Sequence, residues 1–222
     1  PCLHESSEAL RIQIWNSMRI VDFLLSLDFV DPDRLAVTGA SGGGTQSFML
    51  AAVDSRIDIS IPVVQVSAHF YGGCVCESGM PVHKRTDFET NNVEIAASFA
   101  PKPQLIISDG EDWTKNVPKV EYPYIRNVYA IMGAEANVEN AHFPSEGHDY
   151  GYSKRQVMYR FVARHFKLDI SPLLTASGNI REDFVSPVDR PALEVFNKMN
   201  PRPEGSLKNC ESVIDLLNLP YK

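Results

Sequence analysis

The stretch Leu35-Ala36-Val37-Thr38-Gly39-Ala40-Ser41-Gly42-Gly43-Gly44 decides the fold of this chain. Its first four residues form a short apolar strand pattern that runs into a glycine cluster, and residues 45–53 return to a helical pattern. Residues 39–43 fit G-x-S-x-G, which presents a serine on a sharp strand-to-helix turn. Such a turn strains the backbone, and side chains beside the serine are expected to collide with the strand and the helix. We therefore predict that Ser41 is a nucleophile at a helix N-terminus, where free N–H groups stabilise a developing anion.

A turn or a phosphate-binding loop is the alternative interpretation of the same glycines. Phosphate-binding loops of this kind end in Lys-Ser or Lys-Thr, whereas this chain continues as Gly44-Thr45-Gln46. The missing lysine favours the nucleophile, and no cofactor is predicted.

Helical and strand-like patterns alternate on both sides of this turn. Apolar residues recur every three or four positions from Leu10 to Leu25, which predicts a helix before the turn. Further strands are predicted at 59–66, 104–108 and 138–143, and further helices at 90–99, 120–132 and 154–166. Thr90 is the expected cap of the first of these helices. The alternation predicts an α/β fold, a three-layer sandwich with a mostly parallel sheet.

The composition excludes several classes of protein. The 222 residues are 44% hydrophobic, which indicates a globular chain. With 28 acidic and 21 basic residues the net charge is −7, so we expect no nucleic-acid partner. Polar residues and glycines interrupt the longest uncharged stretches, 35–53 and 59–76, so we expect no membrane span. The first residues lack the pattern of a signal peptide.

A serine nucleophile needs a base, and the base needs an acid that orients it. In this architecture the acid and the histidine follow the serine in that order, each on a loop after a later strand. The strand at 104–108 leads into Asp109 and Asp112, and we favour Asp112 because reaching a neighbouring loop needs the longer overhang. The strand at 138–143 contains His142, which we expect to be packed or hydrogen-bonded there. His148 lies in the following loop, so we predict it as the base.

The loop after the second strand lies at the same edge of the sheet as the serine. We expect His69 in this loop and Trp113 beside the acid to line the substrate pocket, with Trp113 shielding the site. His69, Cys74, Cys76 and His83 are the alternative ligands of a metal. The C-x-C spacing is shorter than that of zinc-binding cysteine pairs, so we predict no metal.

The composition shifts after Leu168, where six of the fifteen prolines fall in the last 55 residues. In that stretch residues 210–219 alone look helical. We therefore predict that residues 1–167 are one portion of a catalytic domain. Residues 168–222 are predicted to be an arm that packs on the same domain.

Beyond these patterns, the sequence resembles the α/β-hydrolase superfamily and, more narrowly, its acetyl xylan esterase-like branch. The resemblance rests on these stretches: Asp31-Pro32-Asp33-Arg34, the residues 37–46 around the serine, Gly72-Gly73-Cys74-Val75-Cys76-Glu77, Thr90-Asn91-Asn92-Val93-Glu94, Asp112-Trp113-Thr114 and Glu146-Gly147-His148-Asp149-Tyr150. It implies Ser41 as nucleophile, Asp112 as acid and His148 as base. It also implies small acyl esters on plant polysaccharide as substrates, and a secreted or periplasmic location.

The chain departs from the superfamily pattern before the serine. Several strands and an oxyanion-hole loop normally precede the nucleophile strand, whereas here one helix does. We therefore expect these residues to be the C-terminal part of a longer protein whose N-terminal segment is their partner. Gly42 supplies one N–H of the oxyanion hole, and loss of the other is expected to cost about a hundred- to a thousand-fold in turnover.

Three functions remain open from the sequence. The leading one is a serine hydrolase that deacetylates carbohydrate through an acyl-enzyme. The second is a serine peptidase of the prolyl-oligopeptidase kind, which shares the turn and the order of strands. The third is a binding domain that keeps the fold without the chemistry, and the ordered serine, aspartate and histidine argue against it.

Overall fold

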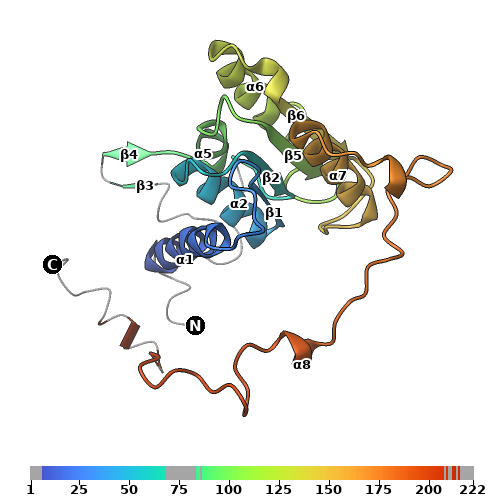
Figure 1. Ribbon diagram of the computed structural model, residues 1–222. Coiled ribbons are helices and arrows are strands. Elements are labelled where there is room, and N and C mark those ends of the chain that lie inside the picture. Colours follow the sequence, from blue (N-terminus) through green and yellow to red (C-terminus); the bar gives the residue numbers. More distant parts are fainter. Residues whose placement is uncertain are drawn as a thin grey trace. The chain divides into compact units, whose positions relative to one another are not determined.

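The computed structural model (Figure 1) describes residues 7–68, 84–85, 87–207, 209, 212–213 and 215. By its contacts the chain divides into two compact units, of which the first runs to Asp169 and the second begins at Ile170. The first unit contains the nucleophile turn and the predicted sheet.

A parallel four-stranded sheet forms the centre of the first unit. Its strands are β1 (Ala36–Ala40), β2 (Ile59–Val63), β5 (Gln104–Asp109) and β6 (Val138–Phe143), in the order β1-β2-β5-β6. All three pairings are parallel, and their carboxyl ends therefore meet at one edge. β1, which leads into the turn, has β2 as its neighbour and lies at the end of this sheet. A two-residue antiparallel pair, β3 (Lys84–Arg85) and β4 (Phe88–Glu89), lies between the predicted strand at 59–66 and the predicted helix at 90–99.

Helices cover both faces of this sheet (Figure 1). On one face α2 (Gly42–Val53), α5 (Asn92–Ala97) and α6 (Glu121–Ile131) pack against the β5 residue Ile106, and α1 (Ser7–Leu25) joins the same core. On the other face α7 (Tyr152–Phe166) packs against Leu105 and Ile107 of the same strand. This alternation along β5 buries both faces of the strand, as expected in a parallel sheet. The predicted α/β sandwich is confirmed.

Most predicted bounds shift by a few residues, and three of these shifts have a clear physical reason. α2 begins at Gly42 rather than at Thr45, because Ser41 is already the N-cap residue. The cap of α5 is Asn91 rather than Thr90: its side chain accepts hydrogen bonds from the N–H groups of the first turn, whereas the Thr90 hydroxyl donates to Glu94. β2 ends at Val63 because the next residue, Val64, has a left-handed backbone with a φ of 48°.

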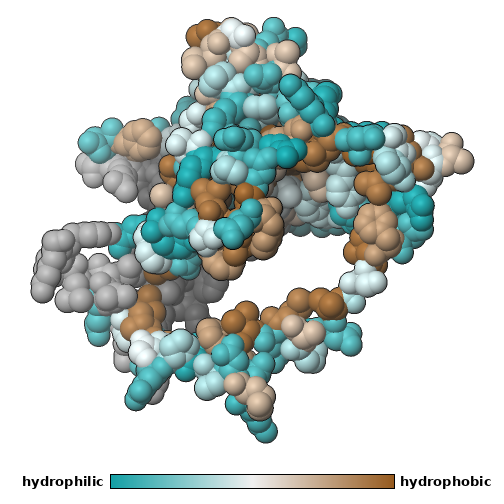
Figure 2. All heavy atoms as spheres, in the orientation of Figure 1, coloured by the Kyte–Doolittle hydropathy of each residue, from teal (hydrophilic) through white to brown (hydrophobic). Residues whose placement is uncertain are grey.

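The described residues of the second unit contain little regular structure. It includes a 3-10 turn at Ser171–Leu173 (η2), a single bridge between Leu174 and Ile180, and the short helix α8 (Arg190–Leu193). The described residues of the predicted 210–219 helix, at positions 212, 213 and 215, are helical, but the prediction that this is the only helical stretch in the second unit was wrong, because α8 lies earlier. Brown apolar side chains along this extended stretch are visible in Figure 2. The packing of this unit on the first stays a prediction.

One further prediction concerns membranes. In the described part of the chain, none of the helices has both the length and the hydropathy that a membrane span requires.

Candidate active site

Ser41 lies at the turn between β1 and α2 with a strained backbone. Its φ is 56° and its ψ is −123°, a left-handed conformation that a residue with a side chain rarely adopts. The Ser41 N–H donates to the Val63 carbonyl of β2, and its own carbonyl accepts from the Thr45 N–H inside the helix. Its hydroxyl makes no capping hydrogen bond to α2. Strain of this kind is typical of functional sites, where it aims a side chain.

The glycines around Ser41 differ in how much space they leave. A Cβ added at Gly39 would lie 2.6 Å from the Gly43 carbonyl oxygen, so the turn closes against itself at that position. A Cβ at Gly44 would lie 2.6 Å from the Gln65 Cβ and 2.9 Å from the Val63 oxygen. At Gly43 an added Cβ would meet nothing within 4 Å. The expectation that a side chain near the serine would collide with its surroundings therefore holds at Gly39 and fails at Gly43. A side chain at Gly44, which lies outside the G-x-S-x-G motif, would also collide.

The predicted acid and base are in direct contact. The Nδ1 atom of His148 lies 2.9 Å from the Oδ2 atom of Asp112, although the two residues are on different loops. The Asp112 side chain is 3% exposed and the His148 side chain 32% exposed. A carboxylate on Nδ1 favours the tautomer that carries its proton there, which leaves Nε2 free to accept a proton.

Thr114 holds the other oxygen of Asp112, and the sequence analysis missed it. Its backbone N–H and its hydroxyl both donate to Asp112 Oδ1, each at 2.5 Å. The Thr114 hydroxyl in turn accepts from the Asp109 N–H at 2.9 Å. The side chain of Thr114 is completely buried. The Asp-x-Thr spacing, which is typical of a turn closed by an aspartate side chain, was the available signal.

The two alternative candidates have other partners. His142 contacts the Ser108 hydroxyl through Nδ1 at 2.9 Å within the sheet, and burial lowers the pKa of its imidazole. Asp109 is completely buried at the end of β5, and this burial raises its pKa to about 6. Neither residue pairs with His148. The structure thus brings Asp112 and His148 together, as the overhang argument predicted.

A hydrogen bond ties the histidine loop to the nucleophile strand. The hydroxyl of Tyr150, two residues after His148, lies 2.7 Å from the Thr38 hydroxyl, three residues before Ser41. Tyr150 also packs against the apolar core that contains Ala40. The loop after β6 therefore runs over to β1, across the two strands that separate them in the sheet. Direct contact between Ser41 and His148 stays a prediction, and such hydrogen bonds are often long until substrate is bound.

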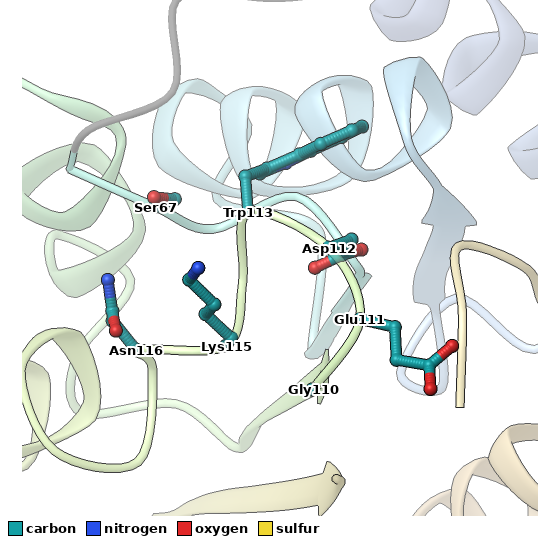
Figure 3. Close-up of a pocket in the computed structure, with 7 residues that line it drawn as sticks. All are labelled: Ser67, Gly110, Glu111, Asp112, Trp113, Lys115 and Asn116. Carbon is teal, nitrogen blue, oxygen red and sulfur yellow. The ribbon is translucent and has the colours of Figure 1, made fainter. Parts of the chain in front are cut away.

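A hollow of about 530 Å³ opens beside the acid. Its lining includes Ser67, the 110–113 segment, Lys115 and Asn116. Figure 3 shows Lys115 and Asn116 extending toward the segment that carries Ser67, while Glu111 points the other way. The Trp113 ring centroid lies 4.2 Å from that of His148, so the indole both covers the base and borders the hollow. The other predicted pocket residue, His69, lies outside the described residues.

The metal alternative has no test in this structure. Its four candidate ligands, at positions 69, 74, 76 and 83, all lie outside the described residues. Among the residues that are described, no group of three or more histidine, cysteine, aspartate or glutamate side chains could hold a metal ion.

Comparisons with known proteins find similarity to esterases in sequence and in fold. A family model for fungal glucuronyl esterase matches residues 3–75, which include the serine turn. The solved structure "Methylesterase BT1017" has 39% sequence identity and a TM-score of 0.85, and the match covers 98% of this chain and 48% of that one. No curated protein matches this chain.

Two more distant structures share the fold. A carbohydrate esterase family 15 glucuronoyl esterase from Caldicellulosiruptor kristjansonii matches at 18% identity and a TM-score of 0.58, over 69% of this chain and 49% of that one. The glucuronoyl esterase catalytic domain from Hypocrea jecorina matches at 18% identity and a TM-score of 0.53, over 68% and 50%. The chain thus spans about half the length of each, and its first unit has the α/β fold that these esterase structures share.

Proposed function

We propose that this chain contains the nucleophile, base and acid of a serine hydrolase that cleaves carboxylic esters of carbohydrate. The observation that carries the proposal is the 2.9 Å contact between His148 and the buried carboxylate of Asp112, on a loop tied to the nucleophile strand. The strained backbone of Ser41, the proposed nucleophile, is a second observation that supports the proposal. A binding domain without chemistry would have no need of an oriented imidazole and a strained serine at the same edge.

In the proposed reaction the Ser41 hydroxyl attacks the ester carbonyl while Nε2 of His148 takes its proton. The Asp112 carboxylate stabilises the imidazolium that forms. The developing oxyanion is stabilised by the Gly42 N–H, which is at the first position of α2 and so has no acceptor within the helix. His148 then gives the proton to the departing alcohol. Water then attacks the acyl carbonyl while Nε2 of His148 takes one of its protons; the bond between the acyl carbon and Ser41 Oγ breaks, the carboxylic acid leaves, and the proton returns to the Ser41 oxygen.

The ester we favour is a methyl ester of a sugar carboxyl group. Support comes from the similarity to a methylesterase at 39% identity and to the glucuronyl esterase model over residues 3–75. In such an ester the sugar is the acyl group and remains on Ser41, whereas in an acetyl ester the sugar is the alcohol and departs first. The hollow beside Asp112 offers an ammonium group, an amide and an indole to a sugar held in the acyl position. The acetyl ester expected from the sequence is the second candidate.

The experiment compares the two esters directly. The chain is incubated with a methyl-esterified polyuronate and with an acetylated xylan, and released methanol and acetate are measured beside the Ser41→Ala variant. We expect methanol from the parent chain and none from the variant. Acetate without methanol would move the proposal to acetyl esters. No release above the variant from either substrate, by a folded chain, contradicts catalysis by these residues.

The second N–H of the oxyanion hole, expected from a loop that precedes the nucleophile strand, stays a prediction. Absolute rates are therefore compared with the Ser41→Ala variant and not with those of a complete esterase.

A further inference from the structure

Beneath the histidine loop lies a lysine that the proposed reaction does not use. Lys154, in the first turn of α7, is completely buried although it carries a positive charge. Its Nζ donates hydrogen bonds to Glu146 Oε2 at 3.1 Å, to the Gly147 carbonyl at 3.1 Å and to Asp149 Oδ1 at 2.5 Å. An ammonium group has three donors, so all of them are used. Burying such a charge costs several kcal/mol unless it is paired and hydrogen-bonded, as it is here.

The three acceptors flank the predicted base in the sequence. They belong to the residues two before, one before and one after His148, so the ammonium group holds the loop on both sides of the imidazole. The Gly147 carbonyl is part of the peptide bond that enters His148 itself. A shift of this lysine would therefore move the backbone that sets the place of the imidazole.

The same ammonium group also contacts the strand that leads to the acid. Lys154 Nζ lies 3.2 Å from Asp109 Oδ1 at the end of β5. This is an ion pair without a hydrogen bond, since both Asp109 carboxylate oxygens have no hydrogen-bond partner. Asp112 follows three residues later. One buried cation is thus shared by the segments that carry the base and the acid.

The acid segment and the histidine loop also approach each other closely. A Cβ added at Gly110 would lie 1.9 Å from the Pro144 carbonyl oxygen, and the Gly110 N–H donates to the Phe143 carbonyl at 2.9 Å. The Glu111 N–H donates to the Glu146 carbonyl at 3.2 Å. A small displacement of one loop is therefore passed on to the other.

We propose that Lys154 is a positioning residue for this hydrolase: its buried ammonium group holds the histidine loop on both sides of His148 through three hydrogen bonds and so sets how His148 faces Asp112 and Ser41. The inference rests on the proposed function where it is tested by rates of labelling and turnover. The NMR measurement of His148 tests it independently of that function. The competing explanation is that Lys154 only neutralises the buried Asp109 and stabilises the fold.

Two variants and their combination separate these explanations. Asp109→Asn removes the buried carboxylate and leaves the three hydrogen bonds of Lys154 in place. Lys154→Met removes the cation and leaves the carboxylate. The double variant removes both, so no uncompensated charge is left inside. Lys198→Met, at an exposed position in the second unit, is the control for the loss of a lysine.

The rate at which a fluorophosphonate labels Ser41, together with kcat and KM, gives the first readout, and melting temperature reports folding. We expect Asp109→Asn and Lys198→Met to label at about the parent rate. The folded double variant should label about a hundred-fold more slowly and lose kcat by a similar factor with little change in KM, because the geometry between base and nucleophile is lost. A double variant that folds and labels at the parent rate would overturn the proposal.

The second readout is the His148 ring N–H proton in NMR spectra, which needs no activity. Hydrogen-bonded to Asp112, this proton should be protected from exchange in the parent and in Asp109→Asn, and exposed to exchange in the double variant. If the parent chain is not labelled, the proposed function fails and this signal alone decides the role of Lys154. An unchanged signal in the double variant overturns it. If the double variant does not fold, Asp149→Ala replaces it, because the side chain of Asp149 is 61% exposed. We expect this variant to label about ten-fold more slowly than the parent. An unchanged labelling rate would contradict the proposal.

Discussion

Replacing Asp112 by asparagine should abolish most of the proposed activity, because Thr114 fixes the orientation of the side chain at position 112. The Oδ1 atom of Asp112 accepts two hydrogen bonds, from the Thr114 N–H and from its hydroxyl. The Thr114 backbone N–H can only donate, so an NH₂ group cannot take the place of Oδ1 there. In Asp112→Asn the amide oxygen must therefore stay on Thr114, and the amide NH₂ must face His148.

This orientation imposes the wrong tautomer on the imidazole. Facing an NH₂ donor, Nδ1 of His148 must be an acceptor, so the ring proton moves to Nε2, which can then no longer take a proton from Ser41. A change of this kind in a serine triad costs about ten-thousand-fold in kcat, or about 5 kcal/mol of transition-state stabilisation. The size of the effect depends on the 2.9 Å contact between His148 and Asp112.

The assay is hydrolysis of an activated ester by Asp112→Asn and by Asp109→Asn, a matched pair on one loop. The ¹⁵N shifts of the His148 ring report the tautomer in both. We expect the ten-thousand-fold loss and the Nε2–H tautomer in Asp112→Asn, and less than about a three-fold loss in Asp109→Asn. Equal losses in the two variants, or an Asp112→Asn chain within ten-fold of the parent, would refute the assignment of the acid.

Three further predictions follow from the same contacts. Gly44→Ala should lower the free energy of unfolding by about 1–3 kcal/mol, because the added Cβ would overlap the Cβ of Gln65. Gly43→Ala should leave the free energy of unfolding unchanged or raise it by up to about 1 kcal/mol, because the added Cβ meets no atom within 4 Å. Urea titration of both variants tests this. Tyr150→Phe should cost about 0.5–1.5 kcal/mol and slow labelling of Ser41, and a double-mutant cycle with Thr38→Val should show that the two effects are coupled. The pKa of Asp109 is raised from 3.8 to about 6, so the protonated carboxyl stabilises the fold below pH 3.8 and this stabilisation is lost as the pH rises through 6. The free energy of unfolding of Asp109→Asn should therefore gain up to about 3 kcal/mol over that of the parent between about pH 4 and pH 7, as measured by urea titration. A difference that does not change with pH would contradict this.

The sheet and the place of the serine could be predicted from the sequence because each rests on local patterns. The apolar run before Gly39 and the glycines after it require a strand, a turn and a helix, and nothing from outside that stretch is needed. The choice of Asp112 over Asp109 was also accessible, since it follows from how far a side chain after the strand end must reach. In the structure Asp109 is buried at the strand end beside Lys154, whereas Asp112 contacts His148.

The supporting contacts could not be predicted because they join residues far apart in the sequence. Nothing in the helical pattern predicted for 154–166 distinguishes Lys154, which is buried, from an exposed basic residue such as Arg164 on the same helix. The hydrogen bond between Tyr150 and Thr38 spans 112 positions. The cap at Asn91 could not be predicted for a different reason. Thr90 and Asn91 are both good capping residues, and which of them is the cap depends on where the backbone turns into the helix, which it does after Asn91.

The most direct test of the central claim is to locate the covalent adduct of a fluorophosphonate by tandem mass spectrometry in the parent chain and in His148→Ala. If the imidazole of His148 activates the serine of the strained turn, the parent chain gains one adduct, on Ser41, and His148→Ala gains it far more slowly or not at all. A parent chain that remains unmodified, an adduct on another residue, or equal labelling of the two chains would contradict the account.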